Sequence, residues 1–223
     1  MRHAPGEDLR RHLHEAPFAA VILAGAYVEA GDAGRHRVRP GDVLLHSAYE
    51  SHLDRFDRSG AEVLVLPLAG WGRGPTLGAV VDPDLLARLA ERDVREASDA
   101  LHDMLQPAAV AAMDWPDLLA RALRENPGLR LSEWAEAMGL HLGSLSRGFR
   151  QLYGLTPAAF RSVQRARLAS EEILTTDSPL SAIAHACGFA DQAHMSRAVL
   201  RLTAHSPAAL RRADGRARRA RAG

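Results

Sequence analysis

The sequence predicts an α+β protein, with a small N-terminal β-barrel and an all-α C-terminal module of two helix-turn-helix units joined by a linker helix. Short β-branched or leucine-rich segments bounded by Gly, Pro or Asp occupy residues 18–68. Two pairs of amphipathic helices, each with a glycine between its members, occupy residues 131–157 and 178–202. Charge divides the chain in the same way, because residues 1–128 hold 14 Arg and 20 acidic residues (−6) and residues 129–223 hold 14 Arg and 7 (+7).

Length and composition limit the class of protein further. The 223 residues suffice for two modest domains, and no apolar run is long enough to cross a membrane. The single cysteine, Cys187, excludes an internal disulfide and is expected to be a buried thiol in a reducing compartment. With no apolar signal-peptide core near the N-terminus, the sequence predicts a cytoplasmic protein.

Four segments are expected along the chain. These are a barrel over residues 1–75, a helical linker or dimerisation segment over 76–128, the two helix-turn-helix units over 129–212, and a disordered basic tail over 213–223.

The strand segments of the barrel read FAAVILAGAYVE, RHRVRPGDVLLHS and AEVLVLPL. Their short spacing favours a small antiparallel barrel or sandwich, whose interior can hold one small ligand. Alternate positions are candidates to line that interior, and plain core packing is the alternative for each of them; they are Val21, Leu23, Val43, Leu45, Val63 and Val65.

Histidines cluster in the same region, at His12, His14, His46 and His52. His12 and His14 have strand spacing, so both imidazoles lie on one face. Three neutral imidazoles can hold a divalent transition metal, which makes His12, His14 and His52 a candidate metal set. The alternative is that all four histidines line a ligand pocket or form hydrogen bonds within it.

Helices are expected in the middle of the chain. After a glycine-rich linker at residues 70–75, one apolar stripe runs through residues 82–105 and a second helix follows over residues 114–126. These helices either form a dimer contact or cover the open face of the barrel.

The stretch SPLSAIAHACGFADQAHMSRAVLRL carries the clearest helix-turn-helix pattern. Ser178 and Pro179 suit a helix start, Gly188 suits the turn, and Asp191 suits the start of the second helix. The polar face of that second helix carries side chains that bond bases or phosphates: Gln192, His194, Ser196, Arg197 and Arg201.

A second copy of the pattern lies upstream, with its turn at Gly139 and with Ser144, Ser146 and Arg147 on its second helix. Gly143 and Gly148 lie inside that helix, and each costs ~0.5–1 kcal/mol relative to Ala. We therefore expect this helix to be less stable than residues 191–203 and to read fewer bases. A long helix over residues 157–175 joins the two units as a strut.

The sequence GFADQAHMSRAVLRLTAHSP resembles the signature GF-x-D-Q-S-x-F-x-R-x-F-x-x-x-x-G-x-T-P of AraC-type transcriptional regulators. Six positions match: Gly188, Phe189, Asp191, Gln192, Arg197 and Pro207. Val199 and Ala204 depart from the usual Phe and Gly. The upstream copy matches its own pattern at Ser146, Arg147, Phe149, Gly154 and Pro157, and His141 replaces the usual capping Ser.

The histidine region resembles the two motifs of cupin barrels. His12, His14, Gly25, Gly41 and His52 match, whereas Phe18, Ser47 and Tyr49 stand where the motifs have Glu, Pro and Gly. This second resemblance implies a cupin-like sensor domain, which AraC-type regulators commonly carry without bound metal.

Together the resemblances imply a non-enzymatic, sequence-specific DNA-binding transcriptional regulator that is controlled by a small effector and acts as a homodimer. Its partner is double-stranded DNA, and Arg147 and Arg197 enter successive major grooves. Two alternatives stay open: a metal-binding cupin sensor or enzyme with a DNA-binding appendage, and an adaptor that keeps the fold but no longer reads DNA.

Overall fold

The computed structural model describes residues 1–68, 76–108, 113–126 and 128–212, and the chain divides into two compact units. The first unit comprises Met1–Asp114 together with Leu152–Gly154, and the second comprises Trp115–Gln151 and the chain from Leu155 onward. The expected helical linker or dimerisation segment over residues 76–128 contributes residues to both units, and its role stays a prediction. The glycine-rich linker and the basic tail expected from the sequence lie outside the described residues.

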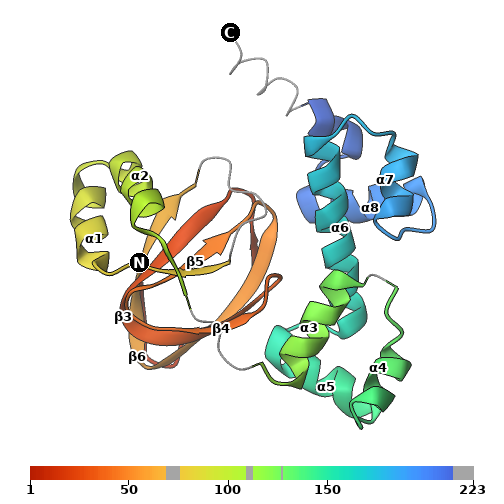
Figure 1. Ribbon diagram of the computed structural model, residues 1–223, viewed down its shortest axis with the longest axis horizontal. Coiled ribbons are helices and arrows are strands. Elements are labelled where there is room, and N and C mark those ends of the chain that lie inside the picture. The colour runs from red at the N-terminus through yellow and green to blue at the C-terminus, as the bar shows by residue number, and fades with distance from the viewer. Residues whose placement is uncertain (69–75, 109–112, 127, 213–223) are drawn as a thin grey trace. The chain divides into compact units, whose positions relative to one another are not determined.

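The first unit is built on one antiparallel sheet, in the order β1-β6-β3-β5-β7-β8, with β2 added on β6 and β4 on β3 (Figure 1). Its strands are β1 (Arg2–His3), β2 (Asp8–His14), β3 (Phe18–Gly31), β4 (Arg35–Val38), β5 (Asp42–His46), β6 (Glu50–Pro67), β7 (Leu77–Ala79) and β8 (Gln106–Pro107).

This sheet is strongly curved. Phe18, at the start of β3, pairs with His46 of β5. Glu29 lies eleven residues further along β3, which in a straight strand would place it ~36 Å away. Its Oε2 is nevertheless 3.4 Å from His46 Nε2. The sheet therefore rolls around an enclosed inner face, as expected for a small barrel.

Both faces of the sheet are buried. The outer face packs against α1 (Pro83–Arg92) and α2 (Val94–Met104), which lie side by side on it (Figure 1). The inner face holds a separate apolar cluster that includes Ile22, Tyr27 and Phe56. Since both faces are apolar, the strands lack the clean alternation that would reveal from sequence which residues point inward.

The expected continuous helix over residues 82–105 is instead two helices. Asp82 caps α1 by accepting a hydrogen bond from the Leu85 backbone N–H at 2.8 Å. Asp93 is extended, with φ −153° and ψ 115°, and its side chain accepts from the Arg95 backbone N–H. A residue that ends α1 and caps α2 explains the break, although the apolar stripe continues through it.

The second unit is all-α. Its helices are α3 (Trp115–Glu125), α4 (Leu131–Ala137), α5 (Leu142–Tyr153), α6 (Pro157–Thr175), α7 (Leu180–Ala186) and α8 (Gln192–Thr203). The bounds of α6 agree with the expected linker helix, and Thr156 caps it by accepting from the Ala159 backbone N–H. Helix α7 begins at Leu180 with no side-chain cap, so the expected cap at Ser178 is wrong.

Helix α6 is the strut between the two helical pairs (Figure 1). Its N-terminal half packs through Phe160, whose ring meets that of Phe149 of α5 edge-on at 5.4 Å between centroids. Its C-terminal half shares a core with α7 and α8 that includes Ile173, Met195 and the buried thiol of Cys187. Within the described residues, no helix combines the length and apolar character needed to cross a membrane.

Candidate functional site

Helix α8 presents a polar face because most of its apolar side chains lie in the core, Leu200 being the exposed exception. Met195, Ala198 and Val199 are buried. The expected DNA-contacting side chains lie on the remaining surface, where Gln192, Arg197 and Arg201 are exposed and His194 and Ser196 are half-buried. Asp191 fixes the start of the helix by accepting a hydrogen bond from the His194 backbone N–H at 2.6 Å, as expected.

Helix α5 is built in the same way. Leu145 and Phe149 are fully buried, whereas Ser144 and Arg147 are exposed and Ser146 is half-buried. The Arg147 guanidinium donates to Ser144 Oγ at 3.3 Å, one turn away. The structure thus brings the three predicted residues of this helix together on one surface.

The turn before each of these helices depends on a glycine in the left-handed conformation, at Gly139 (φ 63°) and Gly188 (φ 75°). Each turn has the same bond, because the Gly139 N–H donates to the Glu136 carbonyl and the Gly188 N–H donates to the His185 carbonyl, both at 3.0 Å. The two helical pairs therefore present their second helices through equivalent turns.

His141 has a role that the sequence pattern did not reveal. Its Nδ1 accepts a hydrogen bond from the Gly143 backbone N–H at 3.2 Å, at the start of α5. An imidazole here supplies the acceptor that the usual serine provides.

The inner face of the sheet gathers the four predicted histidines. The His52 ring centroid lies 4.4 Å from that of His12, 4.6 Å from that of His46 and 5.2 Å from that of His14. One ligand atom from each of His12, His14 and His52 lies within 4.8 Å of the others, which brings together the metal set predicted from sequence.

Two carboxylates that sequence analysis missed complete this cluster. Glu29 on β3 and Asp54 on β6 are cross-strand partners, and the side chains of both are buried. Glu29 Oε2 lies 3.4 Å from His46 Nε2, and Asp54 Oδ2 lies 3.6 Å from His52 Nε2. The sequence marks Glu29 only by its place as an acidic residue inside the apolar run FAAVILAGAYVEAG.

Burial and charge act in opposite directions within the cluster. Burial by itself would raise the pKa of Glu29, but the neighbouring His46 and His52 outweigh it and lower that pKa. Burial disfavours charge on His46 as well, yet Glu29 raises its pKa, so each of the two groups favours the charged form of the other. Burial lowers the pKa of His52 to about 3, which keeps its imidazole neutral at pH 7.

The predicted grouping of Val21 and Leu23 with the histidines is wrong. Both side chains belong to the outer-face cluster that packs beneath α1 and α2. Strand alternation places the histidine side of the sheet opposite to them, and Val65 is 41% exposed. Because α1 and α2 cover the outer face, that face is as apolar as the inner one. The sequence therefore could not show that Ala20 and Ile22, rather than Val21 and Leu23, face inward on β3.

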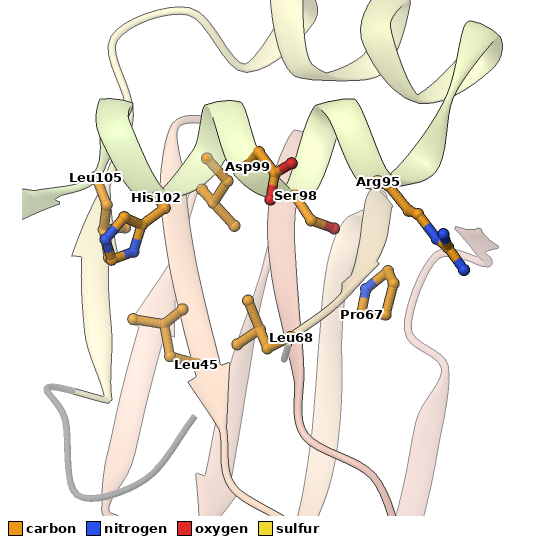
Figure 2. Close-up of a pocket in the computed structure, with 9 residues that line it drawn as sticks. Leu45, Pro67, Leu68, Arg95, Ser98, Asp99, His102 and Leu105 are labelled. Carbon is orange, nitrogen blue, oxygen red and sulfur yellow. The ribbon is translucent and has the colours of Figure 1, made fainter. Parts of the chain in front are cut away.

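The outer face carries a pocket of its own, between the sheet and α2 (Figure 2). Its volume is about 570 Å³. Figure 2 shows Leu45 and Leu68 on the sheet side facing the polar side chains Ser98, Asp99 and His102 of α2. Neither Val21 nor Leu23 lines this pocket.

Comparison with known proteins concerns mainly the second unit. The family model described as a helix-turn-helix domain matches residues 134–213. The transcriptional activator RhaS of Pectobacterium carotovorum, described as HTH-type, is 32% identical over 77 residues. Residues 134–213 are a helix-turn-helix domain of the AraC type.

The RhaS match covers 34% of this chain and 28% of the relative, so it compares the AraC-type domain rather than the whole proteins. Among solved structures, the DNA-binding domain of AdpA in complex with a target DNA is 28% identical, covering 48% of this chain and 97% of that one, with a TM-score of 0.43. Unsaturated fatty acid-bound ToxT from Vibrio cholerae is 11% identical, covering 92% and 91%, with a TM-score of 0.43.

Proposed function

We propose that the whole chain is a sequence-specific DNA-binding transcriptional regulator that reads double-stranded DNA with α5 and α8. The observation that carries this proposal is the pair of equivalent helices, each exposing an arginine, Arg147 and Arg197, on the surface left free by its buried apolar side. Arginine in the major groove bonds guanine O6 and N7 bidentately, and each such pair is worth ~1–3 kcal/mol of base discrimination.

The remaining predicted contacts have different chemical roles. Gln192 suits adenine or a phosphate, whereas Ser144, Ser146, Ser196, His194 and Arg201 suit phosphates or base edges. The second unit carries the positive charge needed for DNA binding, because residues 115–223 hold 16 Arg and 9 acidic residues.

The first unit is proposed to be the sensor. The inner face around His12, His14, His46 and His52 offers polar groups within an otherwise apolar enclosure, as small-molecule sites do. A ligand bound there controls DNA binding only through a difference in its affinity for two arrangements of the protein.

The set His12, His14 and His52 stays a candidate metal site, and homodimerisation stays a prediction. A regulator of this kind acts at the chromosome, in the cytoplasm.

The test is selection of duplexes from a random DNA library with the purified full chain. Binding to a selected and a scrambled duplex is then compared at about 50 and about 200 mM salt, because nonspecific affinity fades with salt whereas sequence preference persists. Arg147→Ala and Arg197→Ala should each relax preference at one base pair by ~1–3 kcal/mol.

The matched control is Arg121→Ala. Arg121 is an exposed arginine on α3 that faces Glu125 along the same helix at 3.8 Å. Its loss should leave base preference unchanged. If the full chain selected no sequence, or if both recognition-helix variants kept full preference, the adaptor reading would replace this proposal.

A further inference from the structure

We propose that the inner face of the sheet binds one divalent transition-metal ion of the zinc class through Glu29, His46 and His52. This set differs from the His12, His14 and His52 set that spacing predicts, and it shares only His52 with it. The inference goes beyond DNA recognition and does not depend on it.

The three donors come from three strands and meet only because the sheet is curved. Glu29 lies near the end of β3, His46 ends β5 and His52 lies near the start of β6. One ligand atom from each lies within 4.8 Å of the other two. Donors bound to one zinc ion at ~2.0–2.2 Å lie ~3.5 Å apart, so small side-chain rotations suffice to close the set.

Burial makes these donors unlike a surface cluster. The exposed fractions of Glu29, His46 and His52 are 4%, 2% and 4%. Among the described residues, Nδ1 of His46 and Nδ1 of His52 are buried without a hydrogen-bond partner, whereas His46 Nε2 lies 3.4 Å from Glu29 Oε2. Polar atoms in such places nearly always have a partner, and a metal ion would supply it for the histidine nitrogens.

Charge favours this set over the one with three histidines. Three neutral imidazoles leave both positive charges of a buried dication uncompensated, whereas Glu29 supplies one negative charge at the ion. His12 and His14 are also only half-buried, and His12 Nδ1 already lies 2.9 Å from the Arg10 carbonyl. Two imidazoles and one glutamate form a known zinc donor set that leaves a fourth position open.

Asp54 has the position of a supporting carboxylate. Its Oδ2 lies 3.6 Å from His52 Nε2, whereas Nδ1, the other ring nitrogen, has no hydrogen-bond partner in the described part of the chain. A carboxylate that holds one nitrogen of a ligating imidazole orients the other toward the metal. Asp54 is therefore a positioning residue rather than a ligand.

The experiment measures zinc bound to the purified full chain, by elemental analysis after equilibration with Zn²⁺ and removal of free ion. The wild type should hold one zinc per chain. Glu29→Gln and His46→Asn should weaken binding at least ~100-fold, and Asp54→Asn ~10–100-fold. His12→Asn and His14→Asn are the matched controls and should retain the metal.

A second measurement requires no variant and therefore does not depend on whether the variants fold. X-ray absorption of the zinc-loaded wild type should report two imidazoles and a carboxylate oxygen. The inference would be overturned if X-ray absorption reported three imidazoles around the zinc. It would also be overturned if only the His12 and His14 variants lost zinc, or if the wild type held no stoichiometric zinc. DNA selection by the same preparations is scored separately, so failure here leaves the proposed function untouched.

Discussion

At the scale of single residues, Ala204 shows how one departure from a family signature affects stability. Ala204 ends α8 in the left-handed conformation with φ 57°, where its N–H donates to the Leu200 carbonyl. The signature has glycine at this position, and only glycine takes this conformation without a steric cost. Ala204→Gly should therefore stabilise the protein by ~1 kcal/mol, measured as the free energy of unfolding in urea.

The control for Ala204 is an alanine with ordinary helical backbone. Ala182 is exposed in α7 and does not have a positive φ. Ala182→Gly should destabilise the protein by ~0.5–1 kcal/mol, because glycine costs backbone entropy in a helix. If both substitutions destabilised the protein alike, strain at Ala204 would not be the cause.

Residues of the inner-face cluster show what spacing along the chain can reveal. His12 and His14 were predicted to share a face because they are two apart on one strand, and they do cluster with His52. The contact between Glu29 and His46 could not be predicted in this way. It joins residues whose strand positions would be far apart if β3 were straight, and sequence does not encode how sharply a sheet curves.

At the scale of elements, the two glycines inside α5 differ in what surrounds them. A Cβ on Gly148 would lie 2.8 Å from Cζ2 and 3.0 Å from Cη2 of Trp115, so that glycine makes room for the indole of α3. A Cβ on Gly143 would lie 3.3 Å from the His141 ring, whose exposed side chain can move. The expectation that both glycines merely weaken α5 is therefore incomplete.

Two alanine variants test this difference. Gly143→Ala gains helix propensity worth at most ~0.5–1 kcal/mol but crowds the His141 ring that caps α5, so it should raise the free energy of unfolding only slightly. Gly148→Ala should gain the same propensity but lose ~1–3 kcal/mol through overpacking against Trp115. Urea unfolding should therefore place Gly143→Ala above the wild type and Gly148→Ala below it.

A double variant identifies the cause. In a Trp115→Leu background the smaller side chain leaves room at position 148, so Gly148→Ala should no longer destabilise the protein. A penalty that persisted there would show that Trp115 is not the neighbour that requires glycine.

Elements with strong local signals were predicted well, and those fixed by tertiary packing were not. Helix α6 has the expected bounds because threonine and proline specify its start and Asp177 to Pro179 follow its end. The break between α1 and α2 was missed because the apolar stripe continues across Asp93, and only the backbone there reveals two caps. The order of the strands could not be predicted, since β7 and β8 lie in the segment whose helices dominate its sequence pattern.

At the scale of the whole molecule, charge follows the division into two units. Residues 1–114 hold 12 Arg and 18 acidic residues (−6), whereas residues 115–223 hold 16 Arg and 9 (+7). The proposed DNA contacts all lie in the second unit, which has its own core around α6. The proposed DNA contacts and the proposed sensor face therefore belong to different compact units of one chain.

This division predicts that residues 115–223, expressed alone, fold and select the same DNA sequence as the full chain. The slope of log affinity against log salt should also be the same, because it counts phosphate contacts made by the second unit. The measurement is a salt titration of both proteins on one selected duplex, with Arg197→Ala in each as the control. A fragment that folds but has a shallower slope, or selects another sequence, would show that the first unit supplies DNA contacts itself, despite its net negative charge.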